Sequence, residues 1–168
     1  MNIIVTADSN WGISYKGKPL AAIPAEKKSR MQEIAGKVAV YTLKCIDDLP
    51  GQQPVRGCVN LIFTDGVKTN IKPSDSVYLF DSLEELRKKV ESYPSEDVYI
   101  IDGEKLYREF LKDTDVVHVT KIDYEYHADA FFEDMDKNPD FVVTGDSEEQ
   151  YCFDIVYNFY RYERRKKN

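Results

Sequence analysis

The sequence predicts an α/β protein with a mostly parallel central sheet, helices on both faces and an antiparallel C-terminal edge. The first observation is the apolar run 98–101, which leads into Gly103 and a helical pattern over 104–111. A strand that is apolar on both faces needs cover on both sides, which favours a parallel sheet flanked by helices. The second observation is that strand and helix patterns alternate through the first two thirds of the chain. The third is that the last strands are joined by loops alone.

The N-terminal half begins with a strand over residues 2–8. A long irregular segment over 9–23 follows, with two glycines and the only tryptophan; loops of this length are usually functional or mobile. Pro24 suits the first position of a helix that runs to residue 35 and ends at Gly36. The next predicted elements are a strand over 38–42, a short polar helix over 43–48 and a buried strand over 59–64.

In the C-terminal half, strand and helix patterns also alternate at first, and the last predicted elements are all strands. A short strand over 76–80 precedes Ser82-Leu83-Glu84-Glu85, whose capping-box spacing opens a helix that runs to Ser92. The apolar strand 98–101 and its helix come next. The last predicted elements are strands over 115–123, 141–143 and 151–162, without helices between them.

Gly103 lies where the chain turns from the central strand into the following helix. The free N–H groups at the start of that helix would attract an anion or the phosphates of a nucleotide. Turns from strand to helix also favour glycine for its backbone freedom alone. The sequence leaves both explanations open.

The composition limits the classes of partner. One domain over residues 1–168 is expected, because a chain of this length with 42% hydrophobic residues can bury its own core. The net charge of −7 argues against a nucleic-acid or anionic-membrane partner, and the basic cluster 161–167 is interpreted as a solvated tail. The three cysteines suggest neither a disulfide framework nor a metal site. With no leader-like N-terminus, we expect a cytoplasmic protein, and we expect a monomer.

Several short motifs occur in a fixed order along the chain. They are Ile13, Ile23-Pro24-Ala25-Glu26, Val98-Tyr99-Ile100-Ile101 with Gly103 and Leu106-Tyr107, His118-Val119-Thr120-Lys121-Ile122-Asp123, and Asp129-Ala130-Phe131-Phe132. With the closing strand Tyr151-Cys152-Phe153 they resemble dihydrofolate reductase over nearly the whole chain. The resemblance implies a dihydrofolate reductase-like fold. It also implies NADPH-dependent reduction of dihydrofolate to tetrahydrofolate, or of a related pterin, within one-carbon metabolism.

The resemblance assigns the pterin pocket to Glu26, where the family keeps an acidic residue. A buried carboxylate there hydrogen-bonds the amino group and ring N–H of the pterin and assists protonation of the adjacent ring nitrogen, so that the ring accepts hydride. Thr120 would support the carboxylate through its hydroxyl, and Tyr107 would lie beside the nicotinamide. Glu26 also has a purely structural explanation, because the helix dipole favours an acidic residue in the first turn of any helix. The other implied contacts are Ile4, Lys27 and Arg30 for the substrate, and Ile13, Thr42, Lys44, Thr64, Asp102 and Gly103 for NADPH.

The substrate site departs from the family's pattern. Lys27 and Arg30 stand where the family has apolar or aromatic residues against the folate rings, and Ala21 replaces a tryptophan of the mobile loop. Arg30 lies four residues after Glu26, so the two can pair on one helix face. Such pairing favours the ionised acid and works against its role as a proton source. In the family, an arginine binds the glutamate carboxylate of folate. This chain has Cys58 at the aligned position, so that charge-assisted contact is lost.

The cofactor site departs as well. The family's Gly-Arg pair aligns with Thr42-Leu43, which removes a phosphate-binding cation that Lys44 could replace. The usual double glycine is Asp102-Gly103, and its carboxylate would place negative charge beside a pyrophosphate.

Two interpretations of different class follow. The first is an NADPH-dependent reductase with Glu26 as the polarising acid, which the retained Glu26, Tyr107 and Thr120 favour. The second is a diverged family member that keeps the scaffold, has lost tight ligand binding and serves as a binding or interaction protein. The altered charges at Arg30 and Asp102 favour the second.

Overall fold

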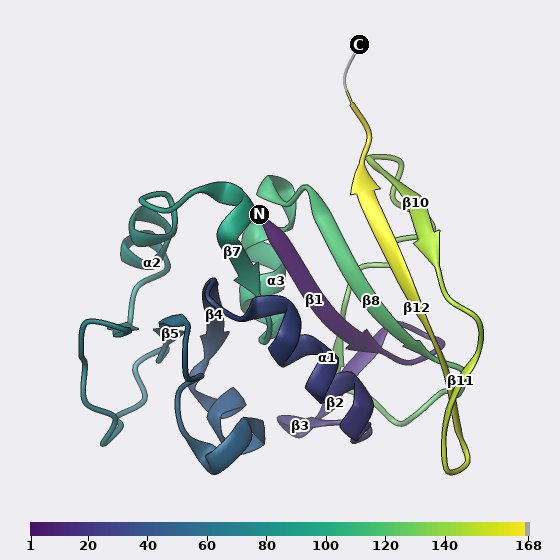
Figure 1. The fold of residues 1–168 in the computed structure, drawn as a ribbon, viewed down its shortest axis with the longest axis horizontal. Coiled ribbons are helices and arrows are strands. Elements are labelled where there is room, and N and C mark those ends of the chain that lie inside the picture. Colours follow the sequence, from purple (N-terminus) through teal and green to yellow (C-terminus); the bar gives the residue numbers. More distant parts are fainter. Residues whose placement is uncertain (167–168) are drawn as a thin grey trace.

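The computed structural model describes residues 1–166 and shows a large sheet with helices against it (Figure 1). Its strands lie in the order β10-β12-β8-β1-β7-β4-β5-β6, and β11 pairs with β12. The strands from β8 to β6 run parallel, whereas β10, β11 and β12 pair antiparallel. Their bounds are β1 (Asn2–Ala7), β4 (Val38–Thr42), β5 (Val59–Phe63), β6 (Val77–Phe80), β7 (Val98–Ile100), β8 (Val116–Ile122), β10 (Phe141–Asp146), β11 (Gln150–Cys152) and β12 (Ile155–Arg164).

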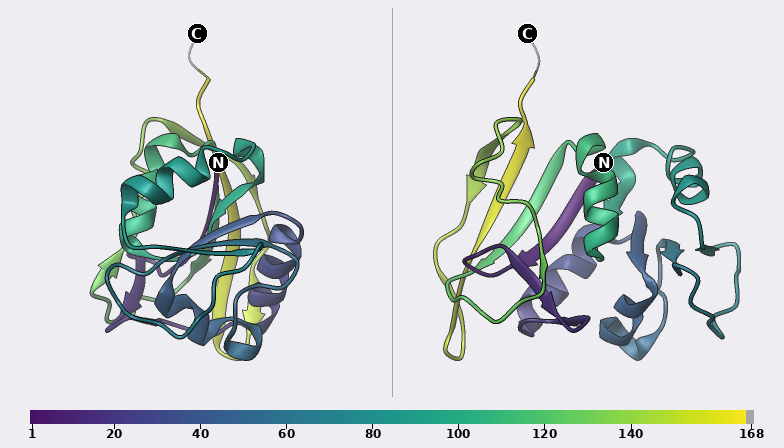
Figure 2. Two further views of the ribbon diagram at one scale, coloured as in Figure 1. Left: turned by 90° about the vertical axis from the view of Figure 1, so that its left-hand side faces the viewer. Right: turned by 180° about the vertical axis from the view of Figure 1, so that it is seen from behind.

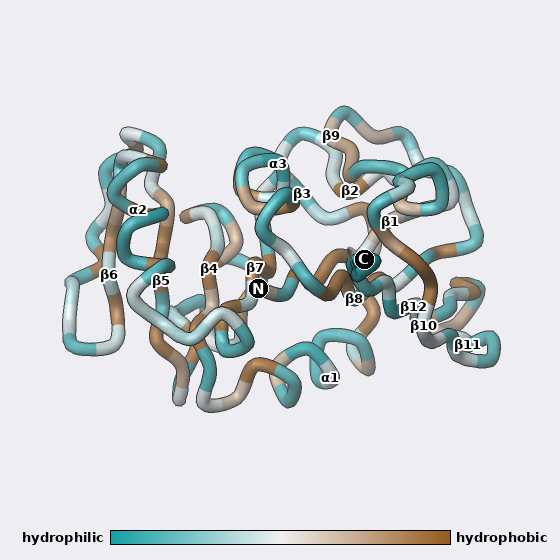
Figure 3. Tube along the Cα trace, turned by 90° about the horizontal axis from the view of Figure 1, so that it is seen from above, coloured by the Kyte–Doolittle hydropathy of each residue, from teal (hydrophilic) through white to brown (hydrophobic). Residues whose placement is uncertain are grey.

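Helices cover both faces of this sheet. The helix α1 (Pro24–Ile34) and the short 3-10 helix η1 (Leu43–Asp48) pack on one face, and α2 (Leu83–Val90) and α3 (Glu104–Phe110) pack on the other. The left view of Figure 2 and the view from above in Figure 3 show α1 on one side of the strands, opposite α2 and α3. The predicted architecture is therefore confirmed. The remaining 3-10 turns are η2 (Pro50–Gln52), η3 (Ser95–Asp97) and η4 (Leu111–Asp113).

The strand β7 occupies the centre of the sheet, between β1 and β4, as its sequence predicts. Val98 and Ile100 are fully buried against α2 and α3, while Tyr99 and Ile101 belong to the cluster under α1. Successive side chains of a strand point to opposite faces, so an uninterrupted apolar run is what a strand covered on both sides requires.

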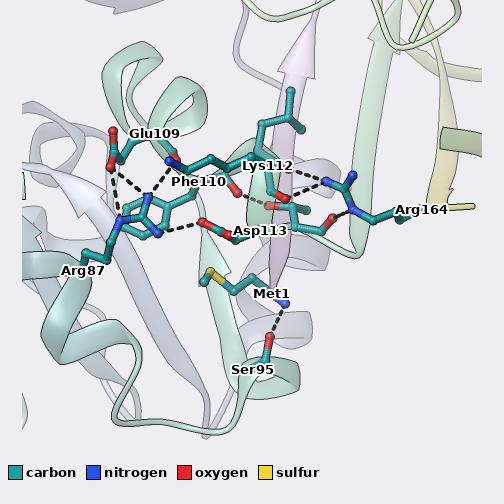
Figure 4. A network of polar contacts seen from close by, with 10 residues as sticks. Met1, Arg87, Ser95, Glu109, Phe110, Lys112, Asp113 and Arg164 are labelled. Carbon is teal, nitrogen blue, oxygen red and sulfur yellow. Dashed lines mark hydrogen bonds and ion pairs between the residues drawn. The ribbon is translucent and has the colours of Figure 1, made fainter. Parts of the chain in front are cut away.

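Polar contacts hold the end of the sheet where β1 begins (Figure 4). Arg87 of α2 binds Glu109 at 2.8 Å and Asp113 at 2.7 Å, and its guanidinium lies 4.8 Å from the centre of the Phe110 ring. Arg164 at the end of β12 donates to the backbone oxygens of Thr114, Leu111 and Lys112. These contacts tie α2 to α3, and β12 to the segment that follows α3, at this end of the sheet.

Two predicted elements are wrong in detail. The segment 9–23 is not wholly irregular, because it contains the strands β2 (Gly12–Tyr15) and β3 (Lys18–Pro19), which pair with each other and with β9 (Ala130–Phe131) in a small second sheet. The single strand predicted over 151–162 is a hairpin of β11 and β12. Phe153 forms its turn with a backbone φ of 55°, and its side chain is fully exposed. The predicted helix start at Ser82 is confirmed, since the Ser82 hydroxyl caps α2 by accepting a bond from the Glu85 N–H.

Candidate active site

A cleft of about 950 Å³ opens at the carboxyl ends of the parallel strands. Its floor comes from the ends of β1, β4, β5 and β7, and its walls come from α1 and from the β2–β3 hairpin. Open parallel sheets bind ligands in the crevice outside these strand ends. The cleft contains most of the residues assigned from sequence, namely Ile13, Glu26, Lys27, Arg30, Thr42, Lys44, Thr64, Asp102, Gly103 and Tyr107.

A triangle of polar side chains occupies the α1 wall of the cleft. Pro24 opens α1, and this places Glu26 in its first turn and Arg30 one turn later. Arg30 Nη2 donates to Glu26 Oε1 at 2.8 Å and to Thr6 Oγ1 at 2.9 Å, and the Thr6 hydroxyl donates to the same carboxylate oxygen at 3.1 Å. The predicted pairing of Arg30 with Glu26 is therefore confirmed.

The Glu26–Arg30 pair is largely withdrawn from water. The Glu26 side chain is 8% exposed and that of Arg30 19%. Burial acts to lower the pKa of Arg30, but the nearby Glu26, Tyr107 and Cys45 together outweigh it and the pKa is raised. Arg30 Nη1 meets the Ile101 carbonyl oxygen only at 3.5 Å, and Nε is buried without a partner among residues 1–166. The arginine is thus held mainly through Nη2, because Nη1 makes only one long bond and Nε makes none among residues 1–166.

Thr120 does not support Glu26 as predicted. Within residues 1–166 no bond joins the two side chains, and the hydroxyl that donates to Glu26 belongs to Thr6. Thr6 and Thr120 are register partners on β1 and β8, and β1 lies one strand further into the sheet. The side chains of Thr120 and Ile4 line a smaller groove of about 300 Å³ behind α1, which also touches Glu26 and Arg30.

Tyr107 lies in the cleft as predicted, with its hydroxyl turned into the protein. The side chain is 6% exposed and its hydroxyl donates to the Ile4 carbonyl oxygen at 2.8 Å. Its ring packs edge-on against Phe132, with 5.3 Å between the ring centres. Burial raises the pKa of Tyr107 well above its usual value, so the hydroxyl stays protonated and serves as a fixed donor.

The turn between β7 and α3 is tight. Gly103 has a φ of 104°, and a Cβ atom there would lie 2.4 Å from Cγ2 of Thr42. The Thr42 hydroxyl donates to Asp102 at 2.6 Å. Burial raises the pKa of Asp102, against the lowering effect of the bond from Thr42. Glycine is required here for two reasons, since its φ is positive and no room exists for a side chain.

Lys44 and Lys105 both line the cleft. Lys44 lines it without an ion-pair partner among residues 1–166, and Lys105 binds Asp65 at 3.1 Å. The Thr64 hydroxyl is already engaged, because it bonds the Phe80 carbonyl oxygen and the Asp81 carboxylate.

A family model described as Dihydrofolate reductase matches residues 1–164. The chain belongs to the dihydrofolate reductase family. Membership confirms the resemblance seen in the sequence and the α/β fold, and it supports an oxidoreductase-type function with a small-molecule substrate. The positions that depart from the dihydrofolate reductase pattern and lie in the cleft are Ala21, Lys27, Arg30, Thr42, Leu43 and Asp102. Cys58 does not lie in the cleft; it is buried under α1 and donates to the Ile34 carbonyl oxygen.

Sequence reasoning missed several residues of the site. Thr6 completes the Glu26–Arg30 triangle, and Cys45 contributes a buried thiol whose pKa is raised by burial. Asp8 is 1% exposed and accepts from the backbone N–H groups of Gly12 at 2.7 Å and Tyr126 at 2.9 Å. This carboxylate fixes the start of the β2–β3 hairpin over the cleft. The only signal for Asp8 in the sequence was its place at the end of the strand predicted over residues 2–8.

The described part of the chain, residues 1–166, sets two further limits. None of its helices is long and apolar enough to cross a membrane. It also contains no cluster of three or more His, Cys, Asp or Glu side chains that could hold a metal ion.

Proposed function

We propose that this chain is a reductase of dihydrofolate or a related pterin, with NADPH as the hydride donor. The proposal rests on one observation above all, the buried Glu26 carboxylate on the α1 wall of a large cleft at the strand ends. A carboxylate in that place binds N–H groups of a pterin ring. It also assists protonation of the ring, which makes the ring a better hydride acceptor. Membership of the dihydrofolate reductase family supports the same reaction class.

The residues around the β7–α3 turn fit a nicotinamide cofactor. Gly103 lies in this turn and lines the cleft, and Lys44 and Lys105 line the same cleft and supply positive charge. When bound, NADPH supplies a hydride. Ile13, Thr42, Thr64, Asp102 and Tyr107 are the further residues that we propose to line the cofactor site, where the Asp102 carboxylate weakens binding. Tyr107 is fixed there by its bond to Ile4.

Glu26 and its two partners position the substrate in this proposal. Oε1 is held by Thr6 and Arg30, so the carboxylate is fixed in one orientation before a ligand arrives. Oε2 accepts no bond among residues 1–166 and is the atom that meets the pterin ring. Lys27 is exposed at the cleft and offers charge to an anionic substrate tail. We assign the support of the acid to Thr6 rather than to Thr120.

The second candidate function is that of a diverged binding or interaction protein. It is favoured by Arg30, whose guanidinium lies on the catalytic acid, and by Asp102, whose carboxylate lies at the cofactor turn. Both residues oppose the ligands of a reductase. In either case we propose a single cytoplasmic domain that acts as a monomer.

Two measurements on the purified chain separate these functions. Loss of NADPH absorbance in the presence of dihydrofolate, at a rate proportional to the protein concentration, is expected of the reductase. A rise in melting temperature with NADPH is expected as well, because a ligand that binds only the folded state stabilises it. Absence of both effects would support the binding protein and exclude the reductase.

A further inference from the structure

The Glu26 side chain borders two spaces, the cleft and the groove of about 300 Å³ behind α1. Glu26 and Arg30 are the two residues that line both. The groove also includes Ser29 and Glu33, which are exposed, and neither of them lines the cleft. The groove therefore connects the buried acid with solvent by a path outside the cleft.

The sequence of α1 explains why this groove is not filled by side chains. The helix face that lines it consists of Glu26, Ser29, Arg30 and Glu33. A helix that packs on a sheet normally presents an apolar stripe at these spacings. Here all four residues are polar, and the short side chain of Ser29 leaves space between the helix and the strands.

Polar side chains of β8 face the groove from the sheet. Thr120 and His118 lie on the same face as Thr6, which is the register partner of Thr120 and bonds α1. Thr120 is 4% exposed, and its hydroxyl makes no hydrogen bond among residues 1–166. In that range Arg30 Nε is the only such atom that is closed off from solvent. Solvent therefore reaches the Thr120 hydroxyl, and it does so through the groove that this residue lines.

His118 is the titratable group of the groove floor. It is half-buried, stacks on Tyr99 with 6.4 Å between the ring centres, and bonds no side chain of the described residues through its ring nitrogens. Burial lowers the pKa of His118, so at neutral pH one ring nitrogen accepts a proton and the other donates one. The charged groups that face it are Glu33 of α1 and Arg161 and Glu163 of β12.

The proposed function requires a proton at Glu26. Reduction of a C=N bond in the pterin adds a hydride to carbon and a proton to nitrogen, so each turnover takes up one proton from water. A pterin and a nicotinamide bound in the cleft would cover Glu26 on that side. The groove would then be the remaining contact between the acid and solvent.

We propose that the groove behind α1 is the proton entry to Glu26, with His118 as the relay and Thr120 as a positioning residue for water. The route rests on the proposed function. A water molecule needs a space of roughly 10–15 Å³ and about two to four polar partners, and the groove offers both. The proton passes from solvent through His118 and hydrogen-bonded water to the Glu26 carboxyl, and from there to the ring nitrogen.

Ser29→Trp tests the route, because an indole at this position fills the groove and leaves the cleft open. We expect kcat for NADPH-dependent reduction of dihydrofolate to fall about tenfold or more, with KM for both ligands unchanged. The solvent deuterium isotope effect on kcat should rise, because proton uptake then limits turnover. Gln32→Trp is the matched control, since Gln32 is an exposed residue of the same helix that lines neither space, and it should keep the wild-type kcat.

His118→Ala tests the relay. It should lower kcat, and free imidazole in the buffer should restore turnover by entering the groove, which a merely structural role of His118 would not produce. Imidazole should have no effect on Ser29→Trp. Circular dichroism checks the fold of each variant, and where either of the two fails to fold, the other decides.

Three results would overturn the route: an unchanged kcat in folded Ser29→Trp, an equal loss in Gln32→Trp, or no rescue of folded His118→Ala by imidazole. Each of these is measured against a wild type that consumes NADPH with dihydrofolate. A wild type without turnover is a different result, because it refutes the proposed function itself and the route with it.

Discussion

Replacing Thr6 with valine removes the hydroxyl from the triangle with Glu26 and Arg30 and leaves the shape of the side chain unchanged. Two bonds are lost, the one donated to Glu26 at 3.1 Å and the one accepted from Arg30 at 2.9 Å. A hydrogen bond to a charged group contributes about 1.5–3 kcal/mol. Glu26 and Arg30 still hold each other at 2.8 Å, so we expect a total loss near that of one such bond, about 1.5–3 kcal/mol.

Urea unfolding measures this loss through the transition midpoint at an unchanged slope. In a thermal scan, a chain of this size changes its melting temperature by about 2–4 °C per kcal/mol, which corresponds to a fall of roughly 3–12 °C. Thr6→Ser is the control, because it keeps the hydroxyl and loses one methyl group, which costs about 0.8 kcal/mol. A valine variant as stable as wild type, or a serine variant as unstable as valine, would refute the account of the triangle.

Three further substitutions test the rest of the cleft. Gly103→Ala should destabilise the fold by about 2–4 kcal/mol in urea unfolding, because its Cβ would overlap Thr42 at a positive φ; a loss below about 0.5 kcal/mol would contradict the close contact. Asp102→Asn should tighten NADPH binding, measured by cofactor fluorescence, because it removes a carboxylate and leaves an amide oxygen for the Thr42 bond; equal or weaker affinity would reject that effect. Arg30→Phe should raise kcat/KM for dihydrofolate, since it frees Glu26 and restores an apolar wall; a decrease would show that Arg30 binds this substrate.

The fold was predictable because most of its signals are local. The apolar run of β7 and the capping box before α2 each act within a few residues of the chain. The β2–β3 hairpin was missed because strands of four and two residues give almost no alternation to detect. The break between β11 and β12 was missed because Phe153 adopts a positive φ that the sequence normally marks with glycine.

The candidate site was predictable in part for the same reason. Glu26 and Arg30 pair within one helix, so their spacing predicts the contact. The hydrogen bond from Thr6 to Glu26 joins β1 to α1 across 20 residues, so it depends on how the helix packs on the sheet. The assignment of Thr120 placed the supporting hydroxyl one strand too far from the acid, an error that only the register of β1 against β8 reveals.

The role of Glu26 is the central claim, and the turnover of Glu26→Gln tests it most directly. The amide keeps the size of the side chain and cannot supply the charge or the proton transfer of a carboxylic acid. NADPH consumption with dihydrofolate at neutral pH should therefore fall by about a hundredfold or more relative to wild type, with the fold intact by circular dichroism. Turnover equal to that of wild type in the folded variant would contradict the assignment of Glu26 as the catalytic acid.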